Sequence, residues 1–195
     1  MRRREFITAI AGSAAAWPLA VHAQQPNQMR RIGVLMGFPE SDPQAQSFIA
    51  AFRDGLQKLG WTEGSNIRID TRWPGFDAES RQRLAKELVA LQPDLILSHT
   101  TPTTTALLQQ TRTIPIVFAT VTDPVGSGFV PSLARPGGNV TGFTLVEPTM
   151  AAKWVELLKE IAPRVNRVAM LFNPATATYA EYFLKPFKAA APSLQ

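Results

Sequence analysis

The sequence contains no cysteine, and its 195 residues include only two histidines. Without cysteine, the chain can form no disulfide framework and offers no thiol for a lipid anchor. His22 lies within the first 23 residues, so His99 is the single histidine of the remaining chain. A zinc site built from cysteine and histidine is therefore disfavoured, because such sites need several of these ligands. We expect neither a metal ion nor a cofactor.

Glycine-rich phosphate loops and a hydrolase motif are also missing. No G-x-G-x-x-G follows the first predicted strand, and Gly137-Gly138 is too short and too late in the chain for a phosphate loop. Ser98, His99 and Asp123 lack the nucleophile elbow that would support a Ser-His-Asp triad. The sequence therefore predicts that the protein is not an enzyme, with an exported α/β hydrolase as the third alternative.

Long blocks of one charge sign are absent. The chain has 20 Lys and Arg residues against 15 Asp and Glu residues, a formal net charge of +5. Basic and acidic residues alternate along predicted helices, as in Lys86-Glu87 and Lys159-Glu160. This alternation is typical of a solvated surface and not of a stripe that binds phosphates. Nucleic acid is therefore not an expected partner.

The first 23 residues carry the three parts of an export signal. A basic start, Arg2 to Arg4, precedes a small and apolar run from Ala9 to Ala20, and a small-residue cleavage site ends at Ala23. The paired arginines before Glu5-Phe6 are typical of the twin-arginine type of signal. A membrane anchor is the alternative, but the apolar run is short for a bilayer. We predict cleavage near Ala23 and a soluble periplasmic protein.

Apolar strand-like runs then alternate with helical patterns. The predicted strands of this first part cover residues 31–36, 66–73, 94–97 and 116–119, with a short one at 140–144. Helices are predicted after Asp42, after Asp77 and over residues 106–110. Alternation at this spacing gives parallel βαβ units with right-handed crossovers. The sequence therefore predicts a Rossmann-like parallel α/β lobe over residues 24–145.

Residues 146–195 contain fewer predicted elements than the first part of the chain. A helix is expected over residues 149–161, a strand over 168–172 and a helix near 179–190. A lone apolar strand needs neighbours on both sides, and about 50 residues with one strand bury too small a core to be stable alone. We therefore expect residues 146–195 to be part of a second lobe, in a sequence that is cut short.

Polar side chains follow two of the predicted strands. Ligands of open α/β sheets bind beyond the carboxyl ends of the strands, where Thr120, Thr122 and Asp123 stand. A run of hydroxyls, Ser98 to Thr105, precedes the helix predicted at 106–110, and helix N-termini can hold a carboxylate or phosphate. Helix capping is the alternative role of the threonines, and an Asp-Pro turn is that of Asp123.

Several sequence blocks together resemble one family. They are Arg31 to Leu35, Pro93 to Leu97, Thr101-Pro102, Pro115 to Phe118, Thr122-Asp123-Pro124-Val125 and Pro136-Gly-Gly-Asn-Val-Thr-Gly142. Their arrangement over residues 30–195 resembles the ABC transporter substrate-binding proteins of the tryptophan and tyrosine-binding type. The resemblance implies the two-lobed type I periplasmic-binding-protein fold. It also implies capture of a small solute between the lobes, delivery to a membrane permease, and no catalysis.

The resemblance also places the ligand pocket, on the loops after the first, third and fourth predicted strands and on the second lobe. The ligand-binding residues it implies are Phe38, Glu40, Ser41, Thr100, Thr101, Thr103, Thr122, Asp123 and Asn173. An aromatic face at Phe38 suits stacking on a ligand, and a core position is its alternative. One departure from the family pattern is His99-Thr100, which stands where a small residue is expected before the Thr-Pro pair.

The sequence thus predicts an exported, monomeric solute-binding component of an ABC transporter. The expected ligand is a small amino acid or similar zwitterion, with its carboxylate at the helix start between Thr100 and Thr103. The alternative function is a periplasmic ligand-sensing module that signals through a partner protein.

Overall fold

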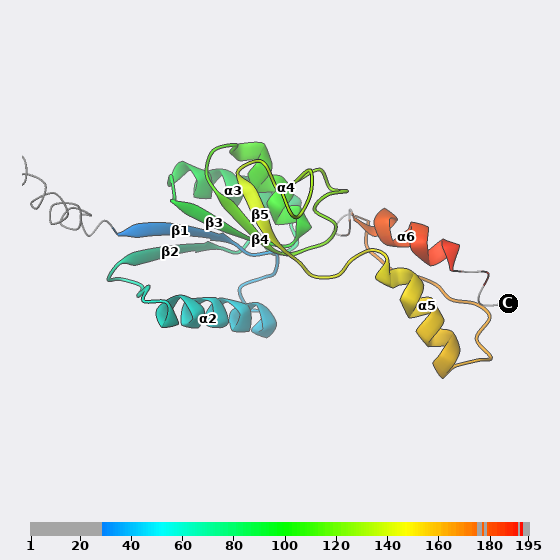
Figure 1. Cartoon of the computed structure of the whole chain (residues 1–195). Helices are drawn as coiled ribbons and strands as arrows, with labels where there is room; N and C mark the ends of the chain where they lie inside the picture. The colour runs from blue at the N-terminus through cyan, green and yellow to red at the C-terminus, as the bar shows by residue number, and fades with distance from the viewer. Residues whose placement is uncertain (1–28, 175–176, 178, 191, 193–195) are drawn as a thin grey trace, which may run out of the picture.

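A five-stranded, fully parallel sheet forms the centre of the protein in the computed structural model, which describes residues 29–174, 177, 179–190 and 192 (Figure 1). The predicted export signal lies outside these residues. The strands are β1 (Arg30–Leu35), β2 (Ile67–Arg72), β3 (Leu95–His99), β4 (Ile116–Val121) and β5 (Val140–Thr144). Their order in the sheet is β2-β1-β3-β4-β5. The predicted parallel α/β architecture is confirmed.

Helices cover both faces of this sheet. α2 (Pro43–Lys58) lies on one face, while α3 (Ala78–Ala90) and α4 (Thr101–Gln110) lie together on the other (Figure 1). On the α2 face, Ile49 packs in a core cluster with β1 and β2. On the opposite face, Leu88 and Leu107 share a core with Phe118 of β4. All four side chains are at most 2% exposed, so the sheet is buried where these helices cover it.

Carboxylate caps fix where the first two of these helices begin. The Asp42 side chain accepts hydrogen bonds from the backbone N–H groups of Gln44 and Ala45, at 2.8 and 2.9 Å. Asp77 accepts one from the N–H of Ser80, at 2.6 Å. Each bond satisfies a donor that the first turn of a helix leaves unpaired. Both helix starts agree with the sequence prediction.

α4 begins five residues before its predicted start at Ala106. Pro102 stands in its first turn, where the missing N–H costs nothing. The hydroxyls of Thr104 and Thr105 donate to the carbonyl oxygens of Thr100 and Thr101, at 2.9 and 3.0 Å. Threonines that bond the preceding turn in this way are compatible with a helix. The run of hydroxyls is therefore mostly helix and not a loop.

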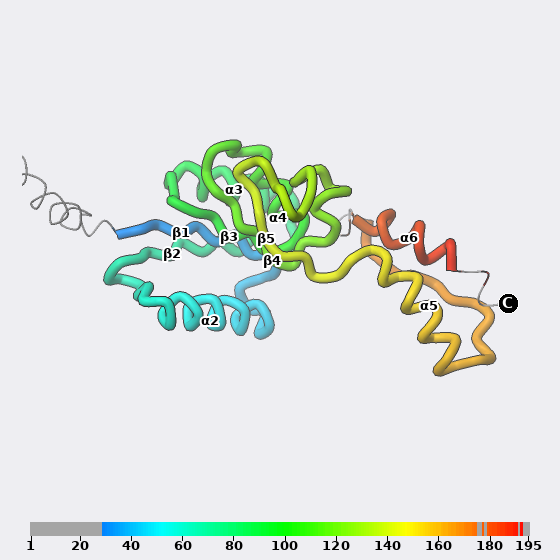
Figure 2. Tube along the Cα trace, viewed as in Figure 1, coloured from blue at the N-terminus to red at the C-terminus, as the bar shows by residue number. Residues whose placement is uncertain are grey.

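The chain then leaves the sheet and forms two helices, α5 (Met150–Ile161) and α6 (Ala180–Ala189), which lie side by side beyond β5 (Figure 2). Trp154 and Phe183 stack between them, with ring centroids 5.6 Å apart. The predicted strand at 168–172 is wrong, because no strand pairs with this segment in the part of the chain that the structure describes. A strand requires such a partner, and Leu171 is 99% exposed.

None of the described helices is both long and apolar enough to cross a bilayer.

Candidate ligand-binding site

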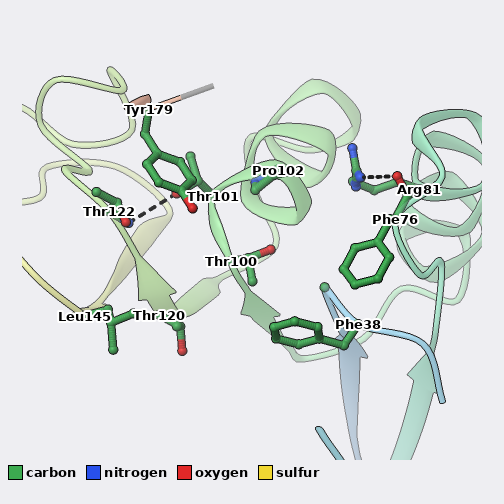
Figure 3. Close-up of a pocket in the computed structure, with 11 residues that line it drawn as sticks. Phe38, Phe76, Arg81, Thr100, Thr101, Pro102, Thr120, Thr122, Leu145 and Tyr179 are labelled. Carbon is green, nitrogen blue, oxygen red and sulfur yellow. Dashed lines mark hydrogen bonds between the residues drawn. The ribbon is translucent and has the colours of Figure 1, made fainter. Parts of the chain in front are cut away.

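A cavity of about 300 Å³ opens at the carboxyl ends of β1, β3 and β4 (Figure 3). Its lining residues are Gly37, Phe38, Phe76, Arg81, Thr100, Thr101, Pro102, Thr120, Thr122, Leu145 and Tyr179. The strand order changes direction between β1 and β3, so the loops that leave these two strands diverge. Such a switch point is where open α/β sheets bind ligands. The volume suits a small molecule.

Glycine at position 37 lets two of these loops touch. A Cβ atom on Gly37 would lie 2.6 Å from Cγ2 of Thr100 and 2.8 Å from the carbonyl oxygen of His99. Carbon and oxygen atoms do not approach this closely without displacement of one loop. The absence of a side chain at position 37 therefore shapes the floor of the cavity.

Two threonines of the cavity have a strained backbone. Thr100 has φ 85° and Thr120 has φ 60°, in the left-handed region that β-branched residues rarely adopt. Strain of this kind costs about 1–3 kcal/mol per residue and clusters at ligand sites. Thr100 directly follows β3, and Thr120 lies one residue before the end of β4; both line the cavity. This placement supports a binding role for this end of the sheet.

Replacing Thr120 by Gly should make the protein more stable. Glycine adopts φ 60° without steric cost, and we expect a net gain of about 1 kcal/mol after its larger unfolded-state entropy is subtracted. Urea unfolding of the variant measures this gain. The matched control is Thr141→Gly, in the regular part of β5, which should be destabilising. A Thr120→Gly protein less stable than the wild type would contradict the strain interpretation.

Two phenylalanines form an aromatic wall of the cavity. The rings of Phe38 and Phe76 meet edge to face, with centroids 5.9 Å apart at 86°. Phe38 follows β1, and Phe76 precedes α3 and is 59% exposed. Figure 3 shows both rings beside the cavity, across from Thr122 and Tyr179. An exposed aromatic wall suits a ligand with a flat, apolar part.

A hydrogen bond joins the loops after β3 and β4. The hydroxyl of Thr101 accepts the backbone N–H of Thr122, at 3.2 Å (Figure 3). Both residues are buried, with exposed fractions of 3% and 6%. This bond fixes the first turn of α4 against the end of β4, so the polar wall of the cavity is preorganised.

His99 lies directly behind the cavity, between two aromatic rings. Its ring centroid is 5.3 Å from that of Phe38 and 5.4 Å from that of Phe48. The side chain is 4% exposed, and neither ring nitrogen has a hydrogen-bond partner among the described residues. Burial lowers the pKa of His99 below its ordinary value, because the charged imidazolium loses solvation there.

The protein should therefore lose stability in mild acid. Above a pH of about 6.5, His99 is neutral in both the folded and the unfolded chain and contributes nothing to the pH dependence. As pH falls below this value, the unfolded chain gains a proton that the folded chain resists, so the free energy of unfolding decreases. Denaturant titrations from mildly alkaline to mildly acidic pH measure the slope. In His99→Leu the slope should be reduced, and equal slopes in both proteins would contradict this assignment.

The structure brings together part of the set predicted from sequence. Four of those residues line the cavity: Phe38, Thr100, Thr101 and Thr122. Glu40 and Ser41 are exposed in the turn before α2, and Asn173 is exposed in the segment before α6. None of these three lines the cavity.

Thr103 and Asp123 do not face the cavity either, and each has a local structural role. Thr103 is fully buried, and its hydroxyl donates to the carbonyl oxygen of His99 and lies 3.1 Å from the hydroxyl of Ser98. The carboxylate of Asp123 accepts the N–H of Gly126, at 2.8 Å. This is the turn role that the sequence left open for Asp123. The ligand contacts that the resemblance implies for these two residues stay predictions.

Sequence reasoning missed Phe76, Arg81, Leu145 and Tyr179. The loop after β2 could have been considered, because it also leaves the carboxyl end of a parallel strand. Arg81 is one of several charged residues in α3, and no local pattern distinguishes it from the others. Tyr179 reaches the cavity from the far end of the chain, which no local pattern indicates.

Comparison with known proteins gives consistent matches. A family model described as ABC transporter substrate binding protein matches residues 36–193. A curated tyrosine-binding protein of Clostridioides difficile (strain R20291) is 34% identical over 148 residues. That match covers 75% of this chain and 41% of the relative.

Two solved structures are similar in both sequence and fold. A conserved domain protein from Vibrio cholerae is 33% identical with a TM-score of 0.76. An ABC domain from Streptococcus pneumoniae, in complex with L-Trp, is 31% identical with a TM-score of 0.75. Each match covers 85% of this chain and 54% of the other, so the chain spans about half the length of these structures.

Proposed function

Because the chain belongs to the ABC transporter substrate-binding protein family, we propose that it captures an amino acid and delivers it to a membrane permease. Its fold is the α/β fold of type I periplasmic binding proteins, with the parallel sheet described above. In this proposal the protein works outside the cytoplasmic membrane, after export.

The observation that carries the proposal is the cavity at the switch point of the sheet. Its lining combines an aromatic wall with threonine hydroxyls held by a strained, tightly packed backbone. None of its 11 lining residues is a histidine, carboxylate, lysine, serine or cysteine. Its polar groups are threonine and tyrosine hydroxyls and one guanidinium, which suit hydrogen bonding to a small solute beside the aromatic wall.

Two further residues of the cavity wall, Leu145 and Tyr179, support capture by closure of two lobes. We assign residues 24–145 to lobe one and residues 146–195 to lobe two. Tyr179, just before α6, belongs to lobe two, and Leu145, just after β5, lies at the border between the lobes. A ligand that touches both parts gains contacts only when they approach each other. Such differential contacts are what shift a hinged protein toward its closed form.

An amino acid with an aromatic side chain is the proposed ligand. The relatives with more than 30% identity include a protein named for tyrosine binding and one solved with L-Trp. An aromatic ring would pack on the wall formed by Phe38 and Phe76.

Calorimetric titration of the purified protein with L-tyrosine and L-tryptophan tests the proposal, with D-glucose as the unrelated solute. We expect saturable binding of at least one amino acid and none of glucose. At a ligand concentration of 100 times Kd, the free energy of unfolding should rise by about 2.7 kcal/mol, which appears as a higher Tm. Absence of both heat and thermal shift with all the common amino acids would refute the proposed function.

A further inference from the structure

Among the described residues that line the cavity, Arg81 is the one with a charge, and no sequence pattern singled it out. It stands in the first half of α3, and Figure 3 shows its side chain between Phe76 and Pro102. A second hollow of about 330 Å³ borders the same guanidinium and also includes Thr101 and Pro102. Arg81 thus lies where the two hollows adjoin, beside the start of α4.

The guanidinium of Arg81 has few partners. Its Nη2 donates to the carbonyl oxygen of Phe76 at 3.3 Å, and its Nε is buried without a hydrogen-bond partner among the described residues. No carboxylate of the described chain forms an ion pair with it, whereas Arg83 on the same helix pairs with Glu87 at 2.9 Å. An arginine offers five N–H donors, so most of the capacity of Arg81 is unused.

The surroundings of Arg81 favour a negative charge. Burial lowers the pKa of Arg81 below its ordinary value, and the carboxylate of Asp77 opposes that effect. The residue nevertheless remains protonated at physiological pH, because the guanidinium pKa is so high. The N-terminus of α4, at Thr101 and Pro102, adds the positive end of a helix dipole on the other side of the hollow. Asp77 is close enough to act on Arg81 but forms no ion pair with it in the described chain, so an anion that enters the cavity would stabilise this half-buried cation further.

We propose that Arg81 binds the carboxylate of the captured solute, so that the solute is an aromatic carboxylate oriented by its acid group. This inference rests on the proposed function and deepens it, since it names the group that the cavity recognises. A planar guanidinium pairs with a planar carboxylate through two parallel hydrogen bonds, which fixes direction as well as affinity. The ring of the solute then lies toward Phe38 and Phe76.

The inference differs from the placement expected from the sequence, which put the carboxylate at the hydroxyls of Thr100 to Thr103. The hydroxyl of Thr103 donates to the carbonyl oxygen of His99, so its proton is already used. The hydroxyl of Thr101 accepts the N–H of Thr122 and offers a solute at most one neutral hydrogen bond. Arg81 supplies a full charge instead, together with Nη donors of which one bond, from Nη2 to the carbonyl oxygen of Phe76, is formed within the described chain; its Nε is buried.

The test compares Arg81→Gln with Arg83→Gln, a matched loss of charge on the same helix. Two probes are titrated by calorimetry: L-tyrosine and tyramine, which is the same molecule without the carboxylate. We expect Arg81→Gln to weaken L-tyrosine binding by about tenfold or more, because a charge-assisted pair is lost. Arg83→Gln should bind L-tyrosine as the wild type does. Tyramine is a cation, so it should bind weakly to the wild type and no more weakly to Arg81→Gln, which no longer repels it.

Further measurements distinguish a failure of the inference about Arg81 from a failure of the proposed function. Arg81→Lys keeps the charge and should recover part of the affinity, which a merely structural role would not predict. If Arg81→Gln binds L-tyrosine with wild-type affinity, the inference is overturned while the proposed function stands. If the wild type binds no amino acid, the proposed function fails, and 3-(4-hydroxyphenyl)propionate then decides the inference. Binding of this amine-free acid that Arg81→Gln abolishes would sustain the anion site, and its absence would overturn it.

Discussion

Replacing Gly37 by Ala should weaken ligand binding by roughly ten- to a hundredfold. The new Cβ would lie 2.6 Å from Cγ2 of Thr100 and 2.8 Å from the carbonyl oxygen of His99, so the loop after β1 or the loop after β3 must move. Forcing an extra atom into a packed region costs about 1–3 kcal/mol. If this cost falls on the bound state, the affinity for the ligand falls by roughly ten- to a hundredfold. Calorimetric titration with L-tyrosine measures the change.

Gly55→Ala is the matched control for this substitution. Gly55 lies in α2, and a Cβ there meets no atom within 4 Å. Alanine in an exposed helix is more favourable than glycine by about 1 kcal/mol, so this variant should be slightly more stable and bind normally. If Gly37→Ala binds L-tyrosine as tightly as Gly55→Ala does, the contact between Gly37 and Thr100 has no part in the site.

Gly142→Ala should give the largest loss of stability, by about 3 kcal/mol. Gly142 pairs with Phe118 across β4 and β5, and a Cβ on it would lie 2.6 Å from Cδ2 of the fully buried Phe118 ring and overlap its carbonyl oxygen. Neither the ring nor the backbone can yield without opening the core or separating β5 from the sheet. For a chain of this size, the Tm should fall by roughly 10 °C.

Thermal unfolding followed by circular dichroism measures this loss, with Gly138→Ala as the control. Gly138 lies in the loop before β5, and a Cβ there meets no atom within 4 Å. The control should unfold at nearly the wild-type temperature. Equal Tm values for Gly142→Ala and Gly138→Ala would show that the close approach of β4 and β5 does not limit stability.

The sequence predicted the sheet well, because its determinants are local. Short apolar runs bounded by turns gave β1, β3 and β4, and the strand predicted over residues 66–73 is β2, at one edge of the sheet. Carboxylates before apolar periodicity gave the starts of α2 and α3. The start of α4 was missed because threonine propensity alone does not reveal hydroxyls that bond the preceding turn.

Elements that depend on distant partners could not be predicted in the same way. Residues 168–172 have the composition of a buried strand, yet strand formation needs a neighbour with which to pair. The residues of the binding site also differ in whether local sequence or only tertiary structure reveals them. The family resemblance implied Phe38, and Thr122 was also found by the rule for carboxyl ends, whereas Arg81 and Tyr179 enter the cavity only through tertiary structure.

We propose that the solute binds at the carboxyl ends of the parallel strands. Backbone amide NMR spectra of the isotope-labelled protein, recorded during titration with L-tyrosine, test it most directly. We predict shifts for Gly37, Thr100, Thr101 and Thr122, which line or floor the cavity, and none for Arg31 and Asp94, which join the opposite ends of β1 and β3. Shifts confined to Arg31 and Asp94, or no shifts at saturating ligand, would contradict the account.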